Sequence, residues 1–115
     1  MVVGSGMIVL WIPESGSLKE KRAVLRSLLK RTQNEFNVSI AEVGDNDHWR
    51  RAKVGFAVVG NDQRFVNAKM DHIVNFIDRM KLAEVVGSKF EITVLSDLTG
   101  FCETETGKYD DFQKG

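Results

Sequence analysis

Residues 2–29 read VVGSGMIVLWIPESGSLKEKRAVLRSLL, and this stretch decides the fold. Its first part, residues 2–12, is rich in β-branched and other apolar residues and is followed directly by a proline, which predicts a strand. Ser17 and Glu20 then have the S-x-x-E spacing of a capping box, in which each side chain satisfies the other residue's free backbone N–H. Leucines at helical spacing follow, so a helix is predicted from Ser17 to about Glu35.

The rest of the chain extends this β–α unit. Strands are predicted over residues 37–43 and 52–60, and the turn residues between them predict a hairpin. A second helix with a regular apolar stripe is predicted after Asn61 or Asp62, and a last strand over residues 90–95. The order βαββαβ predicts an α+β, ferredoxin-like sandwich, with a four-stranded antiparallel sheet and two helices on one face. The first two strands should run parallel, with the third inserted antiparallel between them.

Length and charge limit the class of protein. A chain of 115 residues fits one domain, which we place at residues 1–96, followed by an acidic C-terminal extension at residues 97–115. The 16 Lys and Arg balance the 16 Asp and Glu, so bulk charge alone does not attract the chain to nucleic acid or membrane. The balance is uneven along the chain, because the extension holds five acidic residues and two basic ones.

The N-terminal sequence and the cysteine count predict a compartment. The first charged residue is Glu14, so the basic region of a secretory signal is missing, and the apolar run over residues 7–12 is too short to span a bilayer. The single cysteine, Cys102, has no partner for an internal disulfide. We therefore expect a cytoplasmic protein that does not associate with membranes.

The first strand is apolar on both faces, which predicts self-association. Residues Ile8 and Leu10 point to one side of the sheet, while Met7, Val9 and Trp11 point to the other. Two helices cover only one face of an antiparallel sheet, so an apolar face would meet water, and such a patch usually marks an interface. We expect a homodimer through the free sheet face or a sheet edge. The alternative is a monomer in which the C-terminal extension covers its own sheet.

Charged residues gather at one end of the predicted fold. On a helical wheel the side chains of Lys19, Arg22, Arg26 and Lys30 form one narrow stripe beside the apolar face. Lys21 instead points into the apolar arc, from which its long side chain can reach the end of the sheet. In this topology the helix starts at the end of the sheet where the hairpin lies. The candidate binding residues are therefore Lys19, Lys21, Arg22, Arg26, Lys30, Glu42, Asp45, Asp47, His48, Trp49, Arg50 and Arg51.

Three interpretations of this cluster compete. The basic stripe and Trp49 suit an RNA backbone or phosphate, with the indole as a stacking surface. A metal site would recruit Glu42, Asp45, Asp47 and His48, but these residues lack a known ligand spacing. The third interpretation is a structural network of salt bridges that holds the hairpin against the helix. No phosphate-binding loop, dinucleotide fingerprint or nucleophile–base spacing occurs, so we predict no catalytic residue, no cofactor and no metal.

Three sequence motifs resemble a known family. They are SLKEKR at residues 17–22, FNVSIAEVGD at residues 36–45, and Trp49 followed by Asn61 and Asp62. Together they resemble the YlxP-like family of small bacterial ferredoxin-like proteins of unknown function, over a span from about Val3 to Leu95. The genes of this family commonly lie beside those for translation initiation and ribosome maturation factors, so the resemblance implies a role near the ribosome or its RNA. It implies no catalytic residues. The motif positions that match are Lys19, Lys21, Arg22, Glu42, Asp45 and Trp49.

The sequence thus predicts a non-enzymatic cytoplasmic protein. Its binding surface for RNA or a ribosomal partner would be the basic stripe of the first helix together with the hairpin. The alternative prediction is a homo-oligomeric interaction or scaffold module that binds no nucleic acid and in which the charged cluster is purely structural.

Overall fold

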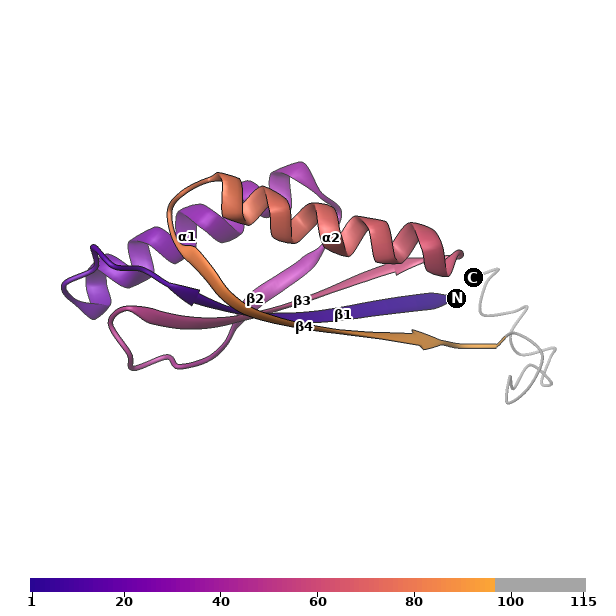
Figure 1. Cartoon of the computed structure of the whole chain (residues 1–115), viewed down its shortest axis with the longest axis horizontal. Coiled ribbons are helices and arrows are strands. Elements are labelled where there is room, and N and C mark those ends of the chain that lie inside the picture. Colours follow the sequence, from indigo (N-terminus) through magenta and orange to yellow (C-terminus); the bar gives the residue numbers. More distant parts are fainter. Residues whose placement is uncertain (97–115) are drawn as a thin grey trace, which may run out of the picture.

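The computed structural model describes residues 1–96 and has the predicted element order. The bounds of the elements are β1 Val2–Trp11, α1 Leu18–Glu35, β2 Ser39–Gly44, β3 Arg51–Gly60, α2 Gln63–Arg79 and β4 Glu84–Val94 (Figure 1). The strands form one sheet in the order β2-β3-β1-β4, with antiparallel neighbours throughout, so β1 and β2 run parallel. Both helices lie on the same side of the sheet (Figure 1). The ferredoxin-like α+β fold is therefore confirmed. The predicted acidic extension and Cys102 lie outside the described residues.

The two helix starts follow local hydrogen bonding. Ser17 caps α1, and its hydroxyl accepts a hydrogen bond from the Glu20 N–H at 3.2 Å. The Glu20 carboxylate completes the motif one residue earlier than a capping box requires, because it accepts from the Gly16 N–H at 2.6 Å. Asp62 caps α2 by accepting from the Arg64 N–H at 3.2 Å. Each helix thus begins where a short polar side chain satisfies a free backbone donor.

Strand β4 begins at Glu84, six residues before the predicted start. Residues 84–89 read EVVGSK, and their glycine and serine weaken the local strand signal. Pairing with β1 overrides this weakness, since Val85 lies opposite Leu10 and Gly87 lies opposite Val9. The register shifts between these two pairs, which is the mark of a β-bulge. The early start is therefore a result of tertiary pairing.

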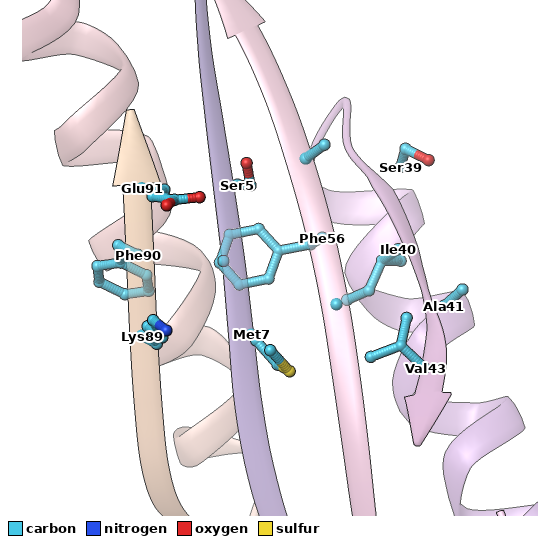
Figure 2. Close-up of a pocket in the computed structure, with 13 residues that line it drawn as sticks. Ser5, Met7, Ser39, Ile40, Ala41, Val43, Phe56, Lys89, Phe90 and Glu91 are labelled. Carbon is cyan, nitrogen blue, oxygen red and sulfur yellow. The ribbon is translucent and has the colours of Figure 1, made fainter. Parts of the chain in front are cut away.

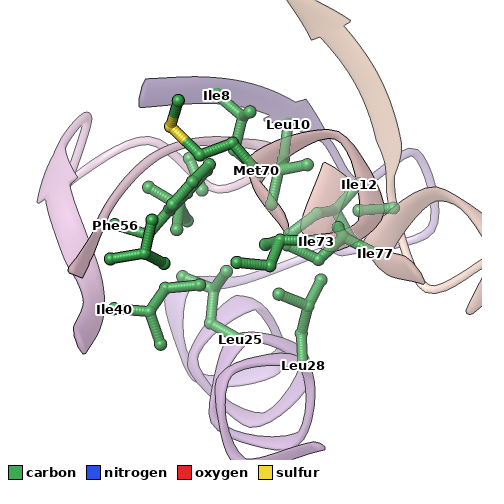
Figure 3. Packing of buried hydrophobic residues seen from close by; sticks show 14 of the residues in the cluster. Ile8, Leu10, Ile12, Leu25, Leu28, Ile40, Phe56, Met70, Ile73 and Ile77 are labelled. Carbon is green, nitrogen blue, oxygen red and sulfur yellow. The ribbon is translucent and has the colours of Figure 1, made fainter. Parts of the chain in front are cut away.

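The core lies between the sheet and the two helices (Figure 3). Ile8 and Leu10 of β1 are fully buried against leucines of α1 and apolar residues of α2. Close packing explains the glycine at position 6, where a Cβ atom would overlap the ring of Phe56. That ring packs over the strand backbone and meets Phe90 edge-on, with ring centroids 6.2 Å apart. The alternation of buried and exposed residues along β1 then leaves Met7 on the opposite face of the sheet, which neither helix covers.

Candidate functional site

The start of α1 and the β2–β3 hairpin lie at the same end of the molecule, as the topology predicted (Figure 1). Lys21 connects them. It is completely buried on the inner side of α1, in the row that also holds Leu25, Leu28 and Thr32. Its ammonium group donates a hydrogen bond to the backbone carbonyl of Asp45 at 2.6 Å. An aliphatic stem within the core and a charged head at its edge are what a long lysine side chain allows.

Glu42 supplies the counter-charge for Lys21. Its Oε2 atom lies 3.0 Å from the ammonium nitrogen, and the side chain of Glu42 is 20% exposed. This oxygen is buried and has no well-aligned hydrogen-bond partner among the described residues, so the contact is an ion pair rather than a directed hydrogen bond. Removing either partner would leave the other charge poorly solvated at the edge of the core.

Asp45 is the first residue of the hairpin loop, directly after β2. Its φ of 57° lies in the left-handed region, which aspartate tolerates better than most residues. Its carbonyl accepts a hydrogen bond from the His48 N–H at 3.0 Å as well as from Lys21. Its carboxylate accepts from Nε of Arg51 at 3.0 Å. Three separate contacts thus hold the hairpin in one conformation.

Arg50 ties the hairpin to the loop that precedes α1. Its Nε donates to the carbonyl of Ser15 at 2.9 Å, and its own carbonyl accepts from the Ile12 N–H at 2.7 Å. The His48 ring accepts from the Arg50 N–H at 3.2 Å and lies edge-on to Trp11, with centroids 6.2 Å apart. We call the five charged residues of these contacts the hairpin network: Lys21, Glu42, Asp45, Arg50 and Arg51.

Four of the predicted cations are arranged differently. Lys19, Arg22, Arg26 and Lys30 are exposed along α1, and within residues 1–96 none of them forms an ion pair. Neighbours three or four apart on a helix lie about 5–6 Å from each other, so these like charges repel. We call these four residues the basic stripe. Trp49 and Asp47 are also exposed, near the tip of the hairpin. The structure thus divides the predicted cluster into a set that is engaged internally and a set that faces solvent.

Two features of the structure are not among the sequence-based predictions. The first is Ser15, which is buried and whose carbonyl accepts a hydrogen bond from the Arg50 side chain. A serine in a loop carries no sequence signal for this role. The second is a hollow of about 500 Å³ on the sheet face opposite the helices (Figure 2). Small residues of β1, β2 and β3 form its floor, and strand register places them side by side. The sequence shows which residues of each strand share a face, but it does not show which residues of neighbouring strands lie opposite each other.

Within residues 1–96 no three histidine, aspartate or glutamate side chains gather closely enough to hold a metal ion. In the same range no helix combines the length and the apolar character needed to cross a bilayer.

Most of the chain matches a known protein family. Residues 3–90 match the model of a family described as "Protein of unknown function (DUF503)". The chain belongs to the DUF503 family. A curated relative is the "Uncharacterized protein YlxP" of Bacillus subtilis (strain 168), which is 46% identical over 67 residues, 58% of this chain and 73% of the relative. The predicted YlxP-like resemblance is thereby confirmed.

Among solved structures, this DUF503 protein is similar to the "De novo designed protein Foldit4". The TM-score is 0.47 and the sequence identity is 12%, and the alignment covers 84% of this chain and 100% of the designed chain. The motif residues Lys19, Lys21, Arg22, Glu42, Asp45 and Trp49 all lie within the match to the DUF503 family.

Proposed function

We propose that this DUF503 protein is a non-enzymatic cytoplasmic protein that binds the phosphate backbone of RNA, on the ribosome or in one of its precursors, through the basic stripe of α1. The observation that carries the proposal is the contrast between the two sets of cations. Lys21, Arg50 and Arg51 are engaged inside the hairpin network, whereas the four cations of the basic stripe face solvent and form no ion pair within residues 1–96.

Electrostatics supports this function. Four like charges along one helix face repel each other, and a polyanion that binds there relieves the repulsion and releases its own counterions. Trp49 belongs to the hairpin that the Lys21–Asp45 hydrogen bond holds against α1, and this residue is 54% exposed. An exposed indole suits an unpaired base, which stacks on it while cations of the same protein contact phosphates. Lys21 has no part in this surface, because its ammonium group is enclosed.

Fluorescence anisotropy with a labelled RNA tests the proposal. Suitable probes are a single strand of about 20 nucleotides and an RNA hairpin of similar length. Both are needed because proteins contact the 2′-hydroxyl and phosphate groups of double-stranded RNA but the unpaired bases of single-stranded RNA. Four phosphate contacts predict that log K falls with log salt concentration with a slope of about −3. Arg22→Glu and Arg26→Glu should each weaken binding and make this slope shallower by about 1 or more. Binding that is independent of salt would contradict the proposal.

The matched control is Arg64→Glu. Arg64 is an exposed arginine near the start of α2, outside the basic stripe, so the same change in net charge should leave RNA binding almost unaffected. If Arg64→Glu weakens binding as much as Arg26→Glu does, the attraction comes from overall charge and the basic stripe is not the site.

A pull-down from cell extract, with and without RNase, separates the proposed function from its alternative. Ribosomal RNA and ribosomal proteins that are lost after RNase treatment support binding to the RNA backbone. Retention of the same proteins after RNase, or the complete absence of nucleic acid from the pull-down, favours the alternative of a protein-interaction or scaffold module.

A further inference from the structure

The sheet face opposite the helices takes no part in the proposed RNA binding, because the basic stripe lies on the other side of the sheet. Strand register arranges its centre as two parallel rows of residues that cross all four strands. The first, which we call the Ser5 row, runs in strand order through Ser39, Ala57, Ser5 and Glu91. The second, the Met7 row, runs through Ala41, Gly55, Met7 and Lys89.

These two rows form the hollow of about 500 Å³ (Figure 2). Its floor consists of serine, alanine and glycine, so the backbone of β1, β2 and β3 is open to close approach by another surface. Apolar side chains border it: Met7 is 37% exposed and Val43 is 56% exposed. Within the hollow, charge occurs only along β4, where Lys89 and Glu91 are neighbours on the same face.

We propose that a second copy of this chain occupies this face, and that the two copies are related by a two-fold axis that runs across the strands between the Ser5 row and the Met7 row. This axis places the Ser5 row of one copy over the Met7 row of the other. Glu91 then faces Lys89 of the partner subunit, and the symmetry produces the same ion pair a second time. Met7 lies over Ser5 of the partner subunit, so a long side chain meets a short one.

The alternation of residues extends this match beyond the centre. One step further from the axis, Val3 of one copy lies over Val9 of the partner subunit, and both belong to the outward-facing set of β1. The strands of the two sheets then run antiparallel and cross at about 30°, as in aligned sheet packing. Small residues at the centre, with Val3, Val9 and Val59 beside them, give the complementary shape that a stable interface needs. Lys53 of β3 also lies on this face, beside Val9, and its side chain extends over Gly44 of β2.

The charge pattern selects this axis over the other two-fold arrangement of the same face. An axis parallel to the strands would place β4 over β2 of the partner subunit. Lys89 and Glu91 would then face Ala41 and Ser39, and each charge would lose water without gaining a partner of opposite sign. The axis across the strands avoids this desolvation cost, because every charge at the centre of the interface meets its complement.

The area of the face is sufficient for a dimer. Strands β1 and β3 are each 10 residues long. Four strands about 4.8 Å apart, at about 3.3 Å per residue, present a flat area of about 600 Å² on each copy. Side chains roughen this surface and enlarge its accessible area, which brings it close to the value of about 800 Å² per partner found in stable interfaces. The proposal is independent of RNA binding, because the helices, and with them the basic stripe, lie on the other side of the sheet.

Sedimentation equilibrium and light scattering on the full chain, from about 1 to about 100 µM, test the oligomeric state. The expected particle has twice the 12.9 kDa mass of the chain. A monomer over the whole range would overturn the proposal, and it is the result expected if the C-terminal extension covers the face within its own chain.

Ala57→Arg tests which surface is used. Ala57 lies in the Ser5 row on β3, in the interior of the sheet, so an arginine there fills the hollow and should convert the dimer into a monomer. The matched control, Ala68→Arg on the exposed side of α2, should remain dimeric. A dimer that survives Ala57→Arg would overturn the proposal, and it is the result expected if the copies associate through the β4 edge.

Charge exchange tests the axis without adding bulk. Lys89→Glu places two carboxylates opposite each other in both symmetry-related contacts, and Glu91→Lys does the same with two ammonium groups. Each single variant should weaken the dimer by about 10-fold or more, and the double variant Lys89→Glu/Glu91→Lys should restore most of that loss. A double variant as weak as the single variants would overturn the proposed axis. Circular dichroism on every variant checks that the fold is retained.

Discussion

The two sides of α1 use the same residue type in opposite ways. On the side that faces the sheet, Lys21 is completely buried and its ammonium group lies against Glu42 and the carbonyl of Asp45. On the side that faces solvent, the four cations of the basic stripe form no ion pair within residues 1–96. Lys19 and Lys21 are only two positions apart, which is about 200° around the helix. Direction relative to the sheet therefore decides whether a lysine stabilises the fold or is available to a partner.

The largest effect should come from the apolar part of the buried side. Leu28→Ala removes a fully buried side chain of α1 and leaves a cavity against the sheet, so the free energy of unfolding should fall by about 3–5 kcal/mol. Urea titration followed by circular dichroism measures this change. Arg26→Ala, two positions earlier on the exposed side, is the control and should change stability by less than about 0.5 kcal/mol.

Lys21→Met tests the charged part of the same side. Methionine keeps most of the buried aliphatic volume but leaves Glu42 without its counter-charge and removes one of the two donors to the Asp45 carbonyl, the other being the His48 N–H. Because Glu42 retains some access to water, we expect a loss of about 2–3 kcal/mol, below the range for a fully buried pair. The double variant Lys21→Met/Glu42→Gln should be more stable than the single variant.

Lys19→Met is the matched control for this prediction, since the same substitution is made on the exposed side of the first turn. It should change the melting temperature by no more than about 2 °C. Equal losses for Lys19→Met and Lys21→Met would mean that burial does not distinguish the two lysines.

Arg51→Ala removes an ion pair whose exposure is intermediate between that of the buried Lys21 and that of the solvent-facing basic stripe. The Arg51–Asp45 ion pair has a distance of 3.0 Å, with side chains 47% and 29% exposed. Water screens such a pair, so its loss should cost less than about 1 kcal/mol in thermal or urea unfolding. High salt should reduce the difference from the wild type further. A cost as large as that of Lys21→Met would show that the hairpin network depends on its outer pair as much as on its buried one.

Arg26→Glu should have the smallest effect on stability, within about 0.5 kcal/mol, because the side chain has no partner within residues 1–96. Removing one of four repelling cations even favours the folded helix slightly. The same variant should lose RNA affinity, so the pair of measurements separates a binding residue from a structural one. A large loss of stability would assign Arg26 to the fold and remove it from the proposed surface.

Most of the fold could be predicted from local sequence signals. The cap at Ser17, the leucine spacing of α1 and the alternation along β1 each depend on residues within one or two turns or strand steps. The inward direction of Lys21 also followed from helical geometry, and its burial agrees with that prediction. The start of β4 was missed because its first residues are held by pairing with β1, and pairing depends on residues far away in the chain.

The candidate site could be predicted only as a neighbourhood. The predicted topology places the start of α1 and the hairpin at one end of the molecule, but it does not separate the roles of the residues that meet there. The separation depends on individual contacts, such as the Arg50 side chain on the Ser15 carbonyl and the Lys21 ammonium group on the Asp45 carbonyl. Neither contact has a signature in residue type or spacing, because each joins a side chain to a backbone group of another element.

By itself, the sequence determined the element order, the helix caps, the two faces of each strand and the family to which the chain belongs. These properties depend on patterns that repeat at the helical or strand period, and short-range sterics and hydrogen bonding enforce them. Tertiary structure alone decided that Arg50 binds the Ser15 carbonyl, where β4 begins, and that small residues from three strands meet in one hollow on the free sheet face. Such features require strand register and the packing of distant elements, and these are set only when the whole core is buried at once.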